Sequence, residues 1–269
     1  MGFFDFFNKE KSLFSDLIYR INIKDLEAVK VLLKKNIDLS QKNKLGYTPL
    51  GLATLLGHKS IVKEILKYDG FVNELSKSGE TALHIASYEG DLEIVKLLLN
   101  NNADINARDY DKRTPIFSLL ESGEDSLDLM KFLMDNGAKV DIKDNDAWTA
   151  LHVVALSGSS ENIVRHLIEN SLNIDEKALD GNTPLHIASY SGNLNTVKLL
   201  VENNANIKTL ANEGLSVLHL AISSKSLELI KYLVEIGVDY HLLDDKGETA
   251  LDLAKGEGLN LIIEYLESL

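Results

Sequence analysis

Histidines and carboxylates are the side chains of this sequence that could bind a metal or exchange protons near neutral pH. Four of the seven histidines end a recurring tetrapeptide, as in Thr81-Ala-Leu-His84; the other three of this set are His152, His186 and His219. The remaining histidines stand alone, without a second histidine or a spaced carboxylate: His58, His166 and His241. The chemistry to consider first is therefore a metal or acid-base site built from the repeated histidines.

Patterns for other kinds of catalysis are missing. The chain has no cysteine, which excludes disulfides, thiolate nucleophiles and cysteine-ligated zinc sites. It also lacks a nucleophile elbow, a glycine-rich phosphate loop and a zincin motif. Solvated surface explains the many carboxylates, such as Asp109, Asp111, Glu121, Glu124 and Asp125. We expect no catalytic residue, no cofactor site and no enzymatic activity.

The histidine tetrapeptide belongs to a repeat that runs through most of the chain. The first residue of each copy, here called its anchor, recurs every 33 to 35 residues: Thr48, Thr81, Thr114, Thr149, Thr183, Ser216 and Thr249. A weaker, earlier copy is found in residues 24–33, which align with residues 90–99. A fixed period of this length is typical of architectures in which each unit packs only on its neighbours.

Each copy predicts two helices and a hairpin. Thr or Ser at the anchor is a good helix N-cap, and a following proline, such as Pro49, fits the first helical position. A glycine nine residues after most anchors, such as Gly57, can end this helix in the left-handed conformation. A second, more apolar helix follows, as in residues 94–99. A glycine two residues before most anchors, such as Gly79, then marks the hairpin turn.

Helix, turn, helix and hairpin at this period, with the signature T-P-L-H-x-A, resemble the ankyrin repeat. The resemblance covers residues 13–269 and implies an all-α solenoid of stacked helix-turn-helix units with projecting β-hairpin loops. We assign residues 1–12 to an apolar segment, 13–47 to an N-terminal cap, 48–248 to six full repeats and 249–269 to a C-terminal cap.

The resemblance also implies that the repeated histidines are structural, hydrogen-bonding residues of the first helices. Successive copies would lie about 10 Å apart in a stack of packed helix pairs. Ligands of one zinc ion must come within about 2 Å of it. We therefore expect no metal site.

Composition limits the partners and the location. With a net charge of −13, the surface should repel nucleic-acid phosphates, so we expect no DNA or RNA partner and favour a protein with a basic surface. No apolar run is long enough for a membrane span, and the N-terminus lacks the features of a signal peptide. We expect a cytoplasmic monomer.

Residues 1–12 allow two interpretations, because their phenylalanines could pack on the first repeat or touch a membrane: Phe3, Phe4, Phe6 and Phe7. We favour packing, since so few basic residues accompany them that binding to a bilayer would be weak. The alternative function is a peripheral membrane scaffold anchored by this segment. The start Met1-Gly2 resembles a myristoylation site, but Phe6 stands where that motif needs Ser or Thr.

Partner-binding residues are predicted at positions that the repeat does not need for itself. In ankyrin repeats these are usually four, three and one residues before the anchor, at the hairpin tip, and seven and eight after it. Tyr, Trp and Arg at such positions are typical of binding hot spots. The candidates on this concave face are Tyr47, Lys77, Tyr88, Glu89, Tyr110, Asp111, Arg113, Glu121, Asp146, Trp148, Asn182 and Tyr190.

Four aromatic residues of this set predict a contact strip: Tyr88, Tyr110, Trp148 and Tyr190. The repeat is least regular nearby, where Lys112 and Ala147 replace the turn glycine, and we interpret this as reshaping of the docking point. The predicted function is a non-catalytic protein-protein interaction module that acts as an adaptor, an inhibitor or an immunity-type neutraliser. The remaining alternatives are an enzyme that uses a pair of carboxylates and a purely structural spacer.

Overall fold

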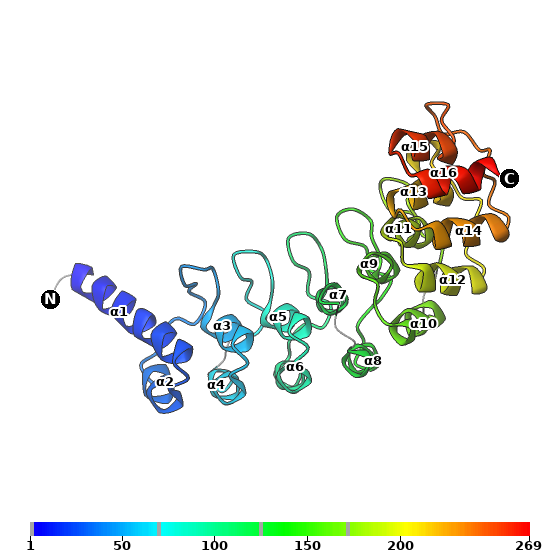
Figure 1. The fold of residues 1–269 in the computed structure, drawn as a ribbon. Helices are drawn as coiled ribbons and strands as arrows, with labels where there is room; N and C mark the ends of the chain where they lie inside the picture. Colours follow the sequence, from blue (N-terminus) through cyan, green and yellow to red (C-terminus); the bar gives the residue numbers. More distant parts are fainter. Residues whose placement is uncertain (1–2, 69–70, 124–125, 171–172) are drawn as a thin grey trace. The chain divides into compact units, whose positions relative to one another are not determined.

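The computed structural model describes the backbone of residues 3–68, 71–123, 126–170 and 173–269, and the side chains of these ranges from Leu13 onward. The described residues form sixteen α-helices, one short 3-10 turn (η1, Asn212–Gly214) and no strand (Figure 1). The predicted all-α fold is therefore confirmed. Within the same ranges, no helix is both long and apolar enough to cross a membrane. The chain divides into two compact units, residues 1–139 (unit 1) and 140–269 (unit 2).

Unit 1 holds four helix pairs: α1 (Phe3–Asn22) and α2 (Leu26–Leu33), α3 (Pro49–Leu55) and α4 (Lys59–Ile65), α5 (Ala82–Tyr88) and α6 (Leu92–Leu99), and α7 (Pro115–Glu121) and α8 (Leu127–Asp135). In Figure 1 the first helices α3, α5 and α7 form one row and α4, α6 and α8 a second row, with the hairpin loops projecting from the first. We call the first helix of each pair the inner helix and the second the outer helix.

Helix α1 runs through residues 12 and 13, where the sequence analysis places a boundary. The predicted packing of Phe3, Phe4, Phe6 and Phe7 falls outside the side chains that the structure describes, and Met1 and Gly2 fall outside its described residues.

Unit 2 repeats the same arrangement with four further pairs: α9 (Ala150–Ser157) and α10 (Glu161–Asn170), α11 (Pro184–Ser191) and α12 (Leu194–Glu202), α13 (Val217–Ser223) and α14 (Leu227–Glu235), and α15 (Ala250–Gly256) and α16 (Asn260–Glu267). The inner helix α11 packs on both α9 and α13, and α13 packs on α15. Each inner helix is thus covered by its neighbours along the stack.

The inner helices begin and end where the repeat pattern predicts. The hydroxyl of Thr81 accepts the N–H of His84 in the first turn of α5, and Pro184 occupies the first turn of α11. At the other end, Gly158 and Gly192 adopt the left-handed conformation that stops α9 and α11. Lys225 takes the same position after α13 with φ of 58°, although it is not a glycine.

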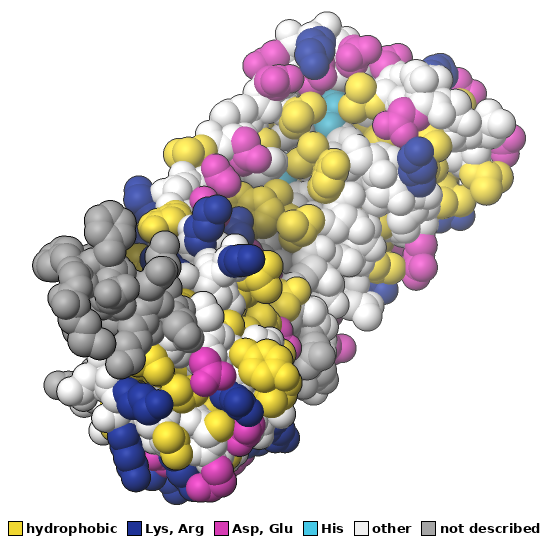
Figure 2. All heavy atoms as spheres, turned by 90° about the vertical axis from the view of Figure 1, so that its left-hand side faces the viewer, with side chains coloured by type: hydrophobic (Ala, Val, Ile, Leu, Met, Phe, Trp, Pro, Cys, Tyr) yellow, Lys and Arg dark blue, Asp and Glu magenta, His cyan; other side chains and the backbone are white. Residues whose placement is uncertain are grey.

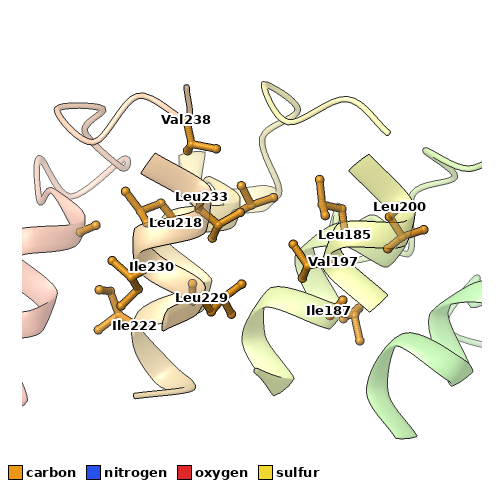
Figure 3. Packing of buried hydrophobic residues seen from close by; sticks show 14 of the residues in the cluster. Leu185, Ile187, Val197, Leu200, Leu218, Ile222, Leu229, Ile230, Leu233 and Val238 are labelled. Atoms are coloured by element: carbon orange, nitrogen blue, oxygen red, sulfur yellow. The ribbon is translucent and has the colours of Figure 1, made fainter. Parts of the chain in front are cut away.

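The core lies between the helices of successive repeats. Figure 3 shows it in unit 2, where Leu185 and Leu218 of the inner helices pack with Val197 and Leu229 of the outer helices, all fully buried. Burial of such a side chain stabilises the fold by about 1.5–3 kcal/mol. Because each repeat contributes to the core on both of its sides, the outward-facing ends of the inner helices and the hairpins remain for other roles.

The hairpins are tight turns that lack the strands expected of β-hairpins. In the loop before α3, the N–H of Asn43 donates to the carbonyl of Tyr47, and the N–H of Gly46 donates to the carbonyl of Asn43. The loop before α9 has the same two bonds, between Asp144 and Trp148 and between Ala147 and Asp144. These two backbone hydrogen bonds close each turn, but among the described residues they do not extend into the ladder of bonds that defines a β-hairpin.

Candidate protein-binding surface

The repeated histidines connect one repeat to the next. His84 is fully buried, and its Nδ1 atom accepts the backbone N–H of Thr81 at 3.1 Å and lies 2.8 Å from the Thr81 hydroxyl. Its Nε2 atom lies 3.1 Å from the carbonyl oxygen of Arg113 and must therefore carry the proton. His152 and His219 bond the carbonyls of Asn182 and Glu248 in the same way, at 3.2 and 3.1 Å.

Burial suppresses proton exchange by these rings. Desolvation lowers the pKa of His84 and of His152, against the opposing effect of the carbonyls that they bond. For His186 the pKa falls to about 4, because burial and the charge of Lys177 outweigh the nearby carbonyls of Leu215 and Thr209. Its Nε2 atom has no hydrogen-bond partner in the described part of the chain. Burial thus favours the neutral form of these histidines. His84 and His152 act as structural connectors, whereas His186 lacks the bond to the next repeat within the described ranges.

In five of the seven hairpins a polar residue five before the anchor holds the turn in shape, a role that the sequence analysis missed. Oδ1 of Asp109 accepts the backbone N–H groups of Asp111 and Arg113 at 2.9 and 2.8 Å. Asp, Asn and Ser side chains commonly form turns in this way, by accepting backbone N–H groups a few residues further on. The signal was available in the sequence, since such residues recur at this position: Asn43, Ser76, Asp109, Asp144 and Asp244.

Neighbouring hairpin tips are joined by backbone hydrogen bonds. The N–H of Lys77 donates to the carbonyl of Gly46 in unit 1, and the N–H of Leu179 donates to the carbonyl of Asp146 in unit 2, both at 2.9 Å. Gly79 has φ of +89°, and a Cβ atom there would lie 2.7 Å from the backbone nitrogen of Tyr110. Only glycine lets the next tip approach so closely. The tips therefore form a fixed row within each unit.

Unit 1 exposes most of its candidate binding residues. Tyr88, at the end of α5, is 51% exposed, and Tyr110, at a hairpin tip, is 62% exposed. The charged candidates Lys77, Glu89 and Asp111 are exposed as well. Three candidates are more constrained: Tyr47 is half-buried, and Arg113 forms an ion pair of 3.0 Å with Glu121.

In unit 2, some candidate binding residues are exposed and others are packed into the fold. Tyr190, at the end of α11, is 52% exposed, and Asp146 is exposed at a hairpin tip. Trp148 is half-buried, stacks on the ring of His152 with centroids 5.8 Å apart and packs against the core. Asn182 is also half-buried, and its backbone carbonyl accepts the bond from His152. Trp148 and Asn182 thus have packing duties that their sequence positions did not reveal.

Two hairpin leucines that the candidate set omits are more exposed than its tyrosines. Leu45 in unit 1 is 75% exposed and Leu179 in unit 2 is 70% exposed. They occupy the predicted hairpin-tip positions, Leu45 three residues and Leu179 four residues before an anchor, so the positional rule includes them. Figure 2 shows one face of the molecule, on which hydrophobic side chains lie among charged side chains of both signs.

Charge differs sharply between the units. Residues 1–139 contain 19 Lys and Arg against 21 Asp and Glu, whereas residues 140–269 contain 9 against 20. Nearly all of the net charge of −13 therefore belongs to unit 2. A partner that meets the hairpins of unit 2 meets a negative surface.

Comparison with known families agrees with the geometry. A family model described as ankyrin repeats (3 copies) matches residues 17–109 and 119–211, and one described as ankyrin repeats (many copies) matches residues 209–254. No curated protein matches the chain significantly. Ankyrin repeats are in general protein-protein interaction modules, and proteins built from them are typically non-catalytic. Since the matches cover most of the chain and each repeat has the expected helix pair, this protein belongs to the ankyrin-repeat family.

Proposed function

We propose that this protein is a non-catalytic module that binds a protein partner through its hairpin tips and the ends of its inner helices. It would act as an adaptor, an inhibitor or an immunity-type neutraliser, as a cytoplasmic monomer whose partner has a basic surface. The cap and repeat boundaries given above, with caps at residues 13–47 and 249–269, are part of this proposal.

One observation supports the proposal most directly: the inner helices α5 and α11 are buried except near their ends, where each exposes a tyrosine. In α5, every residue from Ala82 to Ser87 is buried, but Tyr88 is exposed. In α11, Tyr190 has the same position and is also exposed, whereas Ser189 beside it is buried. Tyrosine offers a large, rigid contact area with few rotatable bonds, which favours binding at low entropic cost.

The state of the histidines supports a non-catalytic function. A general base must reach the proton of a substrate through a hydrogen bond and must titrate near the working pH. The rings of His84 and His152 are buried, use both nitrogens for bonds within the protein, and have a lowered pKa. They meet neither requirement.

Affinity capture from native cell lysate at physiological salt tests the proposal. The wild-type chain is compared with a variant that carries Tyr88→Ala, Tyr110→Ala and Tyr190→Ala. The control variant carries Val31→Ala and Leu261→Ala, which change two exposed apolar side chains of the outer helices α2 and α16. We expect the wild type and the control to retain the same specific protein and the tyrosine variant to lose it.

Equal yields of the same protein from the tyrosine variant would refute the proposed surface. Trp148 is left unchanged in this experiment because its packing on His152 would mix a folding defect with a binding defect.

A further inference from the structure

Unit 2 exposes apolar side chains on the face formed by its inner-helix ends and hairpin tips. Leu156 lies in the last turn of α9 and Tyr190 in the last turn of α11, and each is about half exposed. Leu179 is more exposed still, at the hairpin tip before α11. Covering such surface is favourable by about 25 cal/mol per Å². A partner that covers these side chains would therefore bind with a favourable hydrophobic contribution.

The charge of the same face selects the kind of partner. Three consecutive hairpins of unit 2 carry a carboxylate at the same position, three residues before the anchor: Asp146, Asp180 and Glu213. All three are exposed. The last hairpin of unit 2 carries Lys246 at this position. In unit 1 the third hairpin also has a carboxylate there, Asp111, but the first two hairpins have exposed lysines one residue earlier, Lys44 and Lys77. A basic polypeptide is therefore attracted by unit 2 and disfavoured at these tips of unit 1.

The neighbours of these carboxylates differ in how far they compensate the negative charge. Oδ1 and Oδ2 of Asp180 accept the backbone and side-chain N–H groups of Asn182, which are neutral donors. Glu213 lies 3.3 Å from the ammonium group of Lys246 in the next hairpin and is the most compensated of the three. The attraction for a basic partner is accordingly centred on Asp146 and Asp180.

Hydrogen bonds between the tips set the spacing of this row. Leu179 donates to the carbonyl of Asp146, and Asn212 donates to the carbonyl of Asp180, at 2.9 and 3.0 Å. Two Cα atoms facing each other across such a bond are about 5.5 Å apart, and one further residue adds about 3.8 Å. These two distances limit the interval between carboxylate positions to about 9 Å. The inner helices α9, α11 and α13 pack side by side, and packed helices lie about 8–10 Å apart. Successive carboxylate positions therefore recur at about 8–9 Å.

A polyproline II helix matches that interval. It has three residues per turn and rises about 3.1 Å per residue, so every third side chain returns to the same side after about 9 Å. A β-strand returns its side chains at every second residue, after about 7 Å, and would lose register. We propose that unit 2 binds an extended basic segment of a partner protein, in the polyproline II conformation, with Lys or Arg at every third position. This inference rests on the proposed function and specifies its partner.

Peptide binding to the full chain tests the inference. The probe is a fluorescein-labelled peptide of four Arg-Leu-Pro triplets, in which proline favours the required conformation. One comparison peptide has the same composition with its four arginines contiguous, and a second replaces every arginine by glutamate. Affinities are measured by fluorescence anisotropy at physiological salt.

The protein variant carries Asp146→Asn, Asp180→Asn and Glu213→Gln, which preserve the size of each side chain. Its matched control carries Glu228→Gln, Glu235→Gln and Glu264→Gln on the outer helices α14 and α16, so both variants have the same net charge. We expect the triplet peptide to bind the wild type and the control equally and the tip variant about tenfold more weakly, because three exposed ion pairs of modest strength are lost. We expect the contiguous peptide to bind the wild type at least about threefold more weakly than the triplet peptide, since its arginines cannot follow the row.

Equal or tighter binding of the contiguous or the glutamate peptide would overturn the inference, and so would unchanged affinity of the tip variant. Neither result affects the tyrosine test above, because the tip variant retains Tyr88, Tyr110 and Tyr190. The proposal of a basic, extended partner segment can therefore be refuted while the proposed binding function is retained. Circular dichroism of both variants establishes that each is folded.

Discussion

The Nε2–H group of His84 donates a hydrogen bond to the carbonyl oxygen of Arg113, 3.1 Å away at the start of the next repeat. The same ring accepts the N–H of Thr81, so one side chain joins the beginning of two successive inner helices. Removing it leaves a buried donor and a carbonyl without their partner, in addition to a cavity.

Replacement of His84 by alanine should lower the free energy of unfolding by about 2–4 kcal/mol, since lost buried hydrogen bonds and a cavity add their costs. Chemical denaturation followed by circular dichroism measures the change. The exposed His241→Ala variant is the control and should unfold like the wild type. A loss below about 1 kcal/mol for His84→Ala would contradict the connecting role.

Stability should fall as the pH is lowered from 6.5 towards 4. The unfolded chain takes up a proton near the usual histidine pKa of 6.5, whereas folded His186 takes it up only at about 4. The stability contributed by neutral His186 is thus fully present above pH 6.5 and is lost as the pH falls from 6.5 to 4. At pH 5 the loss in the free energy of unfolding should be about 2 kcal/mol. Denaturant titrations at pH 7.5 and pH 5 measure the difference. His186→Gln should reduce the pH dependence, and a wild-type slope in this variant would disprove the assignment to His186.

The hairpin carboxylate is predicted to act through its hydrogen bonds and not through its charge. Asp109→Ala should destabilise the protein by about 1–2 kcal/mol, because two backbone N–H groups of the tip lose their acceptor. Asp109→Asn keeps an oxygen in place, as Asn43 does in the first hairpin, and should be nearly neutral. Thermal unfolding of the two variants distinguishes them, and equal destabilisation would indicate an electrostatic role.

Ala147 adopts φ of +62° at a turn position that most other repeats give to glycine. Left-handed backbone costs a residue with a side chain about 1–2 kcal/mol. Ala147→Gly should therefore raise the free energy of unfolding by about 1 kcal/mol, after allowing for the greater freedom of glycine in the unfolded chain. Denaturation in urea provides the measurement. If Ala147→Gly unfolded at the same urea concentration as the wild type, the backbone at Ala147 would not be strained.

Alanine variants of Trp148 and Tyr110 should differ in stability, because only Trp148 contributes to the packing of the fold. Trp148→Ala removes the stacking on His152 and part of the core packing, and should destabilise by about 2–3 kcal/mol. Tyr110→Ala removes an exposed ring and should leave the melting temperature within about 1 °C. Differential scanning calorimetry compares them. If Trp148→Ala melted like the wild type, its ring would be available as a binding residue.

Local capping chemistry made the fold predictable from the sequence, whereas the surface depended on neighbours in space. Thr81 and Gly158 mark helix ends because their hydrogen-bonding and backbone preferences act within a few residues. Trp148 could not be assigned in this way, since its position one residue before the anchor is shared by the more polar Asn182 and Glu248, and its burial depends on the ring of His152.

The candidate surface was predicted by position, and position does not distinguish charge available to a partner from charge already paired. Arg113 and Glu121 occupy predicted contact positions but bind each other at 3.0 Å. The difference in net charge between the two units was also hidden by the single net charge of the whole chain.

The backbone bonds between successive hairpin tips have a consequence for how such a protein can evolve. Each tip is held by the one before it, as Leu179 is held by Asp146. A duplicated repeat would therefore insert one more tip at the same interval and leave the existing tips undisturbed. Under the proposed recognition, each duplication would lengthen the readable peptide by three residues, so that specificity could grow in steps by gene duplication rather than by redesign of the surface.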